Sequence, residues 1–199
     1  MAAEMPVEVV RRIDRAKLQA AVITVSDRCS AGTTIDTAGP AVRDLLETKL
    51  DARVSWTKLV PDEADAVVES IRDFSERRVD LILTAGGTGI DSRDVTPEAT
   101  RKVLDRELPG LAEAMRVASA QKTPNAWLSR AVAGIRCETL VVNLPGSKKA
   151  AVENLEAILS VIPHAIEMPR KQAVHEESDA GRLVTIGEAE AVSATSGVR

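Results

Sequence analysis

The feature that most constrains the fold is an alternation of strand-like and helix-like segments through the middle of the chain. A short apolar run rich in β-branched residues predicts a buried strand at 20–26, the alternation of apolar and polar residues predicts a strand at 53–60, and the run "DLILT" predicts a third at 80–84. Between them, apolar residues recur at helical spacing, over 42–50 and 64–74. This order of strand, helix, strand, helix, strand predicts a mostly parallel sheet with right-handed crossovers.

The second half of the chain continues the alternation. Helices are expected at 97–105 and 109–121, a pair of strands at 128–136 and 138–145, and a last helix whose apolar face includes residues 151–162. The sequence contains 44% hydrophobic residues but only three aromatic ones, so the core must be aliphatic. An aliphatic core suits a parallel sheet covered by helices on both faces. We therefore expect a three-layer α/β/α domain.

The two ends of the chain differ from this pattern. Residues 1–17 predict an N-terminal extension, and residues 169–199 show no sustained apolar period and end in small polar residues. We therefore expect one domain at 18–168 followed by a mobile tail.

Composition and charge exclude several classes of protein. The net charge of −4 provides no overall basic footprint for nucleic acid. Cys29 and Cys137 are far apart and predict neither a disulfide framework nor a zinc site. Without an apolar run of signal-peptide or membrane-spanning length, the sequence predicts a reduced cytoplasmic protein with no membrane association.

Polar residues and glycines gather in four turns that follow predicted strands. The turns occupy residues 26–40, 60–65, 84–97 and 143–149. Ligands of open α/β sheets bind at the carboxyl ends of the strands. The sequence therefore predicts a binding site where these four turns meet.

The turn "TAGGTGIDSRDVTP" contains Gly86, Gly87 and Gly89. Glycines allow backbone N–H groups to turn toward a ligand, as phosphate-binding loops require. A tight strand-to-helix turn explains the same residues equally well. Neither a P-loop nor a Rossmann fingerprint is present, because the spacing of glycines and lysine matches neither motif.

The turn "NLPGSKK" combines a helix cap with two cations. Ser147 is a natural N-cap, and Lys148 and Lys149 follow in the first helical turn. The helix dipole disfavours a cation there by roughly 0.3–1 kcal/mol. A bound anion would explain the lysines; the alternative is that both are solvated and screened by salt.

Asp62 and Asp94 each allow two interpretations. Asp62 directly precedes a predicted helix and is a candidate N-cap, while Asp94 is a candidate brace for the turn before Thr96, which we expect to cap the next helix ahead of Pro97. Two carboxylates beside phosphate-binding loops are also what a Mg²⁺–phosphate site needs. The residues alone leave both interpretations open.

Several motifs resemble the molybdenum-cofactor biosynthesis family over residues 18–168. In order along the chain they are "TVSD" with "AG" and "D-x-x-G-P" downstream, "VPDE", "TAGGTG" with "RDVTPEAT", "LSRAVAGIR" and "NLPGSKKA". The resemblance is to the Mog-type molybdopterin adenylyltransferases and to the gephyrin and plant G domains. It implies the molybdopterin-binding-domain fold, a homotrimer, and transfer of AMP from ATP to molybdopterin with Mg²⁺ and release of pyrophosphate. A non-catalytic pterin-binding or scaffold member is the alternative, and hand-off of the product to a molybdenum-insertion protein is a further expectation.

The same resemblance assigns site residues. Asp62 and Asp94 match the family's catalytic acids and would hold Mg²⁺, and Asp27 falls in the turn that faces the nucleotide. Arg28 and Arg93 remain open as contacts to the triphosphate or structural clamps. The remaining substrate-binding assignments are Gly86, Gly87, Thr88, Gly89, Ser129, Pro145, Gly146, Ser147 and Lys148.

Overall fold

A six-stranded sheet forms the centre of the molecule, which is a computed structural model that describes residues 17–169. The predicted N-terminal extension and C-terminal tail lie almost entirely outside these residues. The strand order is β2-β1-β3-β6-β5-β4; the first four strands are parallel, and β5 and β4 run antiparallel to their neighbours. The strands are β1 (Gln19–Val25), β2 (Arg53–Val60), β3 (Leu81–Ala85), β4 (Arg106–Glu107), β5 (Ala133–Arg136) and β6 (Thr139–Leu144).

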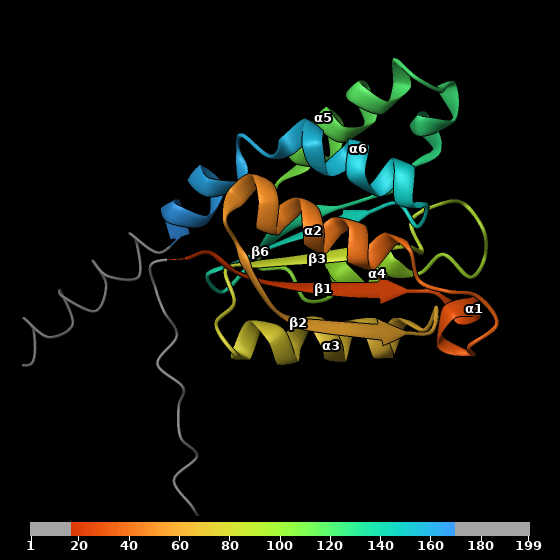
Figure 1. Ribbon diagram of the computed structural model, residues 1–199, viewed down its shortest axis with the longest axis horizontal. Coiled ribbons are helices and arrows are strands. Elements are labelled where there is room, and N and C mark those ends of the chain that lie inside the picture. The colour runs from red at the N-terminus through yellow and green to blue at the C-terminus, as the bar shows by residue number, and fades with distance from the viewer. Residues whose placement is uncertain (1–16, 170–199) are drawn as a thin grey trace, which may run out of the picture.

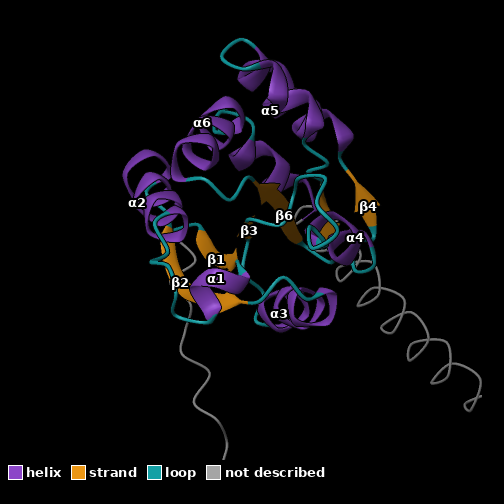
Figure 2. Cartoon of the chain, turned by 90° about the vertical axis from the view of Figure 1, so that its right-hand side faces the viewer, coloured by secondary structure: helices purple, strands orange, loops and turns teal. Residues whose placement is uncertain are grey.

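Helices cover both faces of this sheet, so the predicted three-layer α/β/α architecture is confirmed (Figures 1 and 2). One face carries α2, α5, α6 and the helical residues 162–169; the other carries α3 and α4. The helices are α1 (Asp27–Ser30), α2 (Ala38–Leu50), α3 (Ala64–Glu76), α4 (Thr96–Arg101), α5 (Pro109–Ala120) and α6 (Lys148–Ile158), with a 3₁₀ turn, η1, at Pro124–Leu128.

The buried strands supply one residue to each face in alternation. In β1, Ala20 and Val22 belong to the apolar cluster beneath α2, α5 and α6, whereas Ala21 and Ile23 belong to the cluster beneath α3 and α4. Successive side chains of a strand point to opposite faces, so both faces of a central strand are apolar when helices cover both. This arrangement explains why the central strands β1, β3 and β6 are mostly apolar in sequence, whereas the exposed edge strand β2 alternates.

Two predicted elements are shorter than expected. The helix expected at 97–105 ends at Arg101. Beyond it, Val103 is buried in the apolar cluster beneath α3 and α4, and the backbone N–H of Asp105 donates to the carbonyl of Ile135 (2.8 Å). The chain thereby enters β4, which the sequence did not predict. The strand expected at 128–136 occupies only 133–136. The residues before it form hydrogen bonds with the glycine-rich loop, which is the turn at 84–97, instead of pairing in the sheet.

Among residues 17–169, none of the helices is both long and apolar enough to cross a membrane.

Candidate functional site

The four predicted turns meet at one edge of the sheet and line a common cleft of about 680 Å³. The cleft lies at the carboxyl ends of β1, β2, β3 and β6. Its volume falls in the range of small-molecule sites, roughly 300–1,000 Å³. The lining includes Ser26, Asp27, Arg28, Cys29, Asp36, Asp62, Gly86, Gly87, Asp94, Gly146, Ser147 and Lys148.

Glycines bring the backbones of three turns into direct contact. A Cβ on Gly86 would collide with the carbonyl oxygen of Val25, and one on Gly146 would lie 3.2 Å from the Cα of Gly86. Gly86 and Gly87 also have φ of +118° and +61°, a region that side-chain-bearing residues rarely adopt. Absence of side chains at these positions therefore allows the turns after β1, β3 and β6 to pack against one another.

Asp62 does not cap α3, because Glu63 is the residue before the helix and Asp62 instead forms hydrogen bonds with the turn after β1. The backbone N–H of Asp27 donates to Asp62 Oδ2 (2.7 Å), and the backbone N–H of Asp62 donates to Asp27 Oδ1 (2.9 Å). Burial raises the pKa of Asp62, and the charges of Asp27 and Asp94 raise it further. The interpretation of Asp62 as the N-cap of α3 is therefore wrong.

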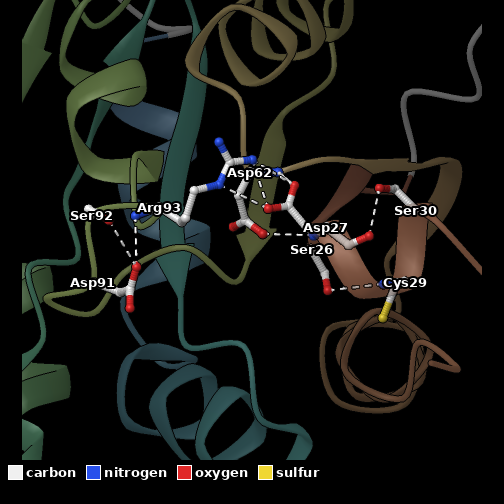
Figure 3. A network of polar contacts seen from close by, with 8 residues as sticks. All are labelled: Ser26, Asp27, Cys29, Ser30, Asp62, Asp91, Ser92 and Arg93. Atoms are coloured by element: carbon white, nitrogen blue, oxygen red, sulfur yellow. Dashed lines mark hydrogen bonds and ion pairs between the residues drawn. The ribbon is translucent and has the colours of Figure 1, made fainter. Parts of the chain in front are cut away.

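Arg93 clamps the β3–α4 loop to the turn after β1 (Figure 3). Its guanidinium donates to both carboxylate oxygens of Asp27, at 2.7 to 3.0 Å, and its backbone N–H donates to Asp91 Oδ1 (3.0 Å). The hydrogen bonds from the guanidinium lower the pKa of Asp27. Arg93 is therefore a structural clamp in this structure, while Arg28 lines the cleft.

Asp94 both braces its loop and lines the cleft. Its Oδ2 accepts from the backbone N–H of Asp91 (2.9 Å), so the bracing interpretation is confirmed, and its side chain lies beside the backbone of Gly89. The carbonyl of Asp94 accepts from the guanidinium of Arg130.

Arg130 holds the glycine-rich loop from the other side, and the sequence did not predict this. Its Nε donates to the carbonyl of Gly89 (2.6 Å), its backbone N–H donates to the carbonyl of Thr88 (3.0 Å), and its guanidinium also pairs with Glu98. The one available signal was an arginine inside an apolar, strand-like run. Asp36 begins the "D-x-x-G-P" motif but was given no role from the sequence. It accepts from the hydroxyl of Thr24 (2.7 Å) and from two N–H groups at the start of α2.

Four of the predicted site residues do not line the cleft. Thr88 is buried, with 5% of its surface exposed, and Gly89 contacts the carboxylate of Asp94. The hydroxyl of Ser129 accepts from the backbone N–H of Ala131 (3.4 Å). Within residues 17–169 these three and Pro145 are absent from the cleft lining, so their predicted contacts to substrate stay predictions.

The N-terminus of α6 presents a cation to the cleft. Ser147 is the N-cap as predicted, since its Oγ accepts from the backbone N–H of Ala150 (3.3 Å). Lys148 lines the cleft, and Lys149 does not. Neither lysine forms an ion pair with any residue that the structure describes.

The residues of the cleft are compatible with a divalent cation whose coordination shell is completed by waters and substrate phosphates. Residues 17–169 contain no group of three or more His, Cys, Asp or Glu side chains able to hold a metal. Mg²⁺, however, binds through one or two carboxylates, with waters and substrate phosphates as the remaining ligands. Asp62 and Asp94 line the same cleft, and their mutual repulsion is what a cation would relieve.

One buried hydroxyl of the site has no partner. The expectation that Thr96 caps α4 is wrong, because α4 begins at Thr96 itself and Val95 precedes it. The Thr96 hydroxyl is fully buried and forms no hydrogen bond. It lies against Gly87, near Asp62 Oδ1.

A mostly parallel α/β sheet with a glycine-rich cleft at the carboxyl ends of its strands places the protein in the class of open α/β-sheet domains, whose ligands bind at this edge. Comparison with known families narrows this class. The family described as "probable molybdopterin binding domain" matches residues 21–164. The chain belongs to this molybdenum-cofactor biosynthesis family, as the sequence motifs predicted.

Named relatives agree with this assignment. The chain is 42% identical over 149 residues to a molybdopterin adenylyltransferase of Helicobacter pylori, covering 74% of this chain and 85% of that protein. It is 43% identical to gephyrin of Dictyostelium discoideum over 73% of this chain but only 21% of gephyrin. Among solved structures, the molybdopterin biosynthesis enzyme MoaB from Thermus thermophilus is 49% identical with a TM-score of 0.72, covering 76% of this chain and 96% of that one.

Proposed function

We propose that the protein is a molybdopterin adenylyltransferase, which transfers AMP from ATP to the phosphate of molybdopterin and releases pyrophosphate. The observation that carries this proposal is the convergence of four turns on one cleft, with Asp27, Asp62 and Asp94 among its acids and Lys148 at a helix N-terminus. The relatives named molybdopterin adenylyltransferase support the same reaction.

The reaction needs positioning more than acid–base chemistry. An oxygen of the molybdopterin phosphate attacks the α-phosphorus of ATP, and the bond from that phosphorus to the oxygen bridging to the β-phosphorus breaks. Pyrophosphate leaves with the bond electrons. Because the attacking phosphate is already anionic at neutral pH, no strong general base is required, and catalysis consists of alignment and charge neutralisation.

The residues of the cleft suit these two tasks. Mg²⁺ held by Asp62 and Asp94 would neutralise charge on the phosphates of ATP. Lys148 and the backbone N–H groups of the glycine-rich loop would bind the phosphate of molybdopterin, where the α6 dipole also favours an anion. Asp27, fixed by Arg93, would orient the nucleotide from the opposite turn.

Three wider properties belong to the same proposal. We expect the chain to form a homotrimer, to act in the cytoplasm, and to pass adenylyl-molybdopterin to a molybdenum-insertion protein. These expectations come from resemblance to the family.

Mass spectrometry of the product tests the reaction. The full chain is incubated with molybdopterin, ATP and Mg²⁺, and adenylyl-molybdopterin and pyrophosphate are expected to appear together. Asp94→Asn should abolish turnover, while Asp65→Asn, an exposed acid of α3 outside the cleft, should retain it.

The second candidate is a pterin-binding or scaffold protein without turnover. It is favoured by the 43% identity to gephyrin, a much longer protein of which this chain covers about a fifth. Molybdopterin binding without product, under conditions where the Helicobacter pylori relative produces it, would select this candidate.

A further inference from the structure

The buried hydroxyl of Thr96 lacks the partner that such groups have elsewhere in the fold. In α3, the hydroxyls of Ser70 and Ser75 donate to carbonyls four residues earlier, at 2.6 and 2.7 Å. In α4, Thr100 accepts from the side-chain amide of Asn143 (2.9 Å). Thr96 is the first residue of α4, so no helical carbonyl precedes it. A buried unpaired hydroxyl is destabilising, and a functional partner is one reason for a protein to retain it.

The surroundings of this hydroxyl point toward the cleft. The position that a Cβ of Gly87 would occupy lies in contact with Thr96 Oγ1 and 3.1 Å from Asp62 Oδ1. Asp62 Oδ2 accepts from Asp27, whereas Oδ1 forms no hydrogen bond with any residue the structure describes. A free carboxylate oxygen and a free hydroxyl thus face the same side of Gly87, which lines the cleft.

We propose that Thr96 is a further residue of the divalent-cation site, and that its hydroxyl holds a water of the hydrated ion whose charge Asp62 balances. This inference rests on the proposed function, because it extends the site predicted at Asp62 and Asp94. Mg²⁺ gives up its waters reluctantly and is held partly through them, so neutral hydroxyls serve as partners of those waters.

The charges around the hydroxyl favour a cation over an anion. Burial raises the pKa of Asp62, and the negative charges of Asp27 and Asp94 raise it further while the Arg93 charge opposes them. The two neighbouring carboxylates also repel a phosphate oxygen at this position. Because the Thr96 hydroxyl is fully covered in this structure, cation binding requires the glycine-rich loop to shift. The backbone N–H of Thr96 donates to the carbonyl of Gly87 (3.1 Å), so a shift of that loop would be felt at the start of α4.

Binding of Mn²⁺ alone to the full chain, measured by electron paramagnetic resonance, tests the proposal without any turnover. Thr96→Val keeps the shape of the side chain and removes the hydroxyl. We expect its Kd for Mn²⁺ to rise about tenfold, the usual effect of losing an outer partner of a metal. Its Tm without metal should be no lower than that of the parent protein. Thr96→Ser should restore most of the affinity.

Thr100→Val is the matched control, since it removes a buried hydroxyl from the same helix that is already hydrogen-bonded. It should lower Tm and leave the Kd for Mn²⁺ unchanged. The proposal is wrong if the parent protein does not bind Mn²⁺, if Thr96→Val binds it as tightly as the parent, or if Thr96→Val weakens pyrophosphate binding instead. If the parent protein binds Mn²⁺ in a Thr96-dependent way but transfers no AMP, the proposed function is wrong and the inference about Thr96 still holds.

Discussion

Asp27 and Asp62 are joined by two reciprocal hydrogen bonds, in which the backbone N–H of each donates to the carboxylate of the other, at 2.7 and 2.9 Å. The pair ties the turn after β1 to the turn after β2. Its two carboxyls have opposite pKa shifts, because Arg93 stabilises the charge of Asp27 whereas burial opposes the charge of Asp62. The cleft is thereby held together by groups that differ in their response to pH.

Asp62→Asn should change stability in a pH-dependent way. A carboxyl whose folded pKa is raised contributes most to stability below its unfolded value of 3.8, and that contribution is lost as the pH rises through the folded pKa. The Tm of Asp62→Asn relative to the parent protein should therefore increase with pH across this window and then level off. Thermal unfolding from about pH 3.5 to about pH 7 measures this difference. A relative Tm that falls with rising pH for Asp62→Asn would contradict the assignment.

Arg130→Met should loosen the glycine-rich loop. The substitution keeps an apolar stem but leaves the carbonyls of Gly89 and Asp94 without their donor. We expect a loss of about 1–3 kcal/mol in the free energy of unfolding and faster hydrogen exchange over 87–96. Arg101→Met, which breaks an exposed pair with Glu107, should cost less than about 1 kcal/mol. Equal losses in both variants would remove the special role of Arg130.

Alanine substitutions at four glycines should rank in a definite order. Gly86→Ala should be the most damaging, because its φ is +118° and its Cβ would strike a backbone oxygen, and Gly87→Ala should follow, because its Cβ would strike a side chain. For Gly32→Ala the positive φ is the one unfavourable feature, so we expect a loss of roughly 1–2 kcal/mol in the free energy of unfolding.

Gly110→Ala completes this series as the control. Its Cβ would meet no atom within 4 Å, in the first turn of α5, so we expect a gain of about 0.4–1 kcal/mol. Urea unfolding of the four variants checks the ranking, and a Gly87→Ala protein as stable as Gly32→Ala would show that the contact with Thr96 is easily relieved.

Lys148→Gln should improve stability and impair anion binding. A cation in the first turn of a helix opposes the dipole, so its removal should add roughly 0.3–1 kcal/mol. Binding of inorganic phosphate, which stands in for the phosphate of molybdopterin and is measured by calorimetry, should weaken severalfold, since Lys148 lines the cleft. Lys149→Gln should give a similar gain in stability with little change in phosphate affinity. If both variants bind phosphate normally, the anion site lies elsewhere.

The strands and helices that depend on local pattern were predictable from the sequence. β1, β3 and β6 are buried on both faces and are mostly apolar in sequence, and α3 shows a clear apolar face. β4 and the early end of α4 were not predictable, because they depend on pairing with β5, about thirty residues away. Local propensity contains no information about such a partner.

The features of the site likewise fall into those that the sequence predicts and those that depend on distant partners. The gathering of turns at one sheet edge followed from strand order, since carboxyl ends of parallel strands share an edge. The clamp between Arg93 and Asp27, and the grip of Arg130 on backbone carbonyls, join residues 66 and about 40 positions apart. These contacts depend on the geometry of side chains in the folded protein, which cannot be predicted from the spacing of residues in the sequence.

The approach of Gly146 to Gly86 restricts how this domain can evolve. A side chain on Gly146 would extend toward the Cα of Gly86, and a side chain on Gly86 would strike the carbonyl oxygen of Val25, so enlarging either glycine cannot be compensated by shrinking the other, which is already the smallest residue. In a library randomised at both positions and selected for a folded product, we expect the glycine pair to survive together while neighbouring loop residues drift. The edge of the sheet therefore tolerates variation in chemistry more readily than variation in bulk.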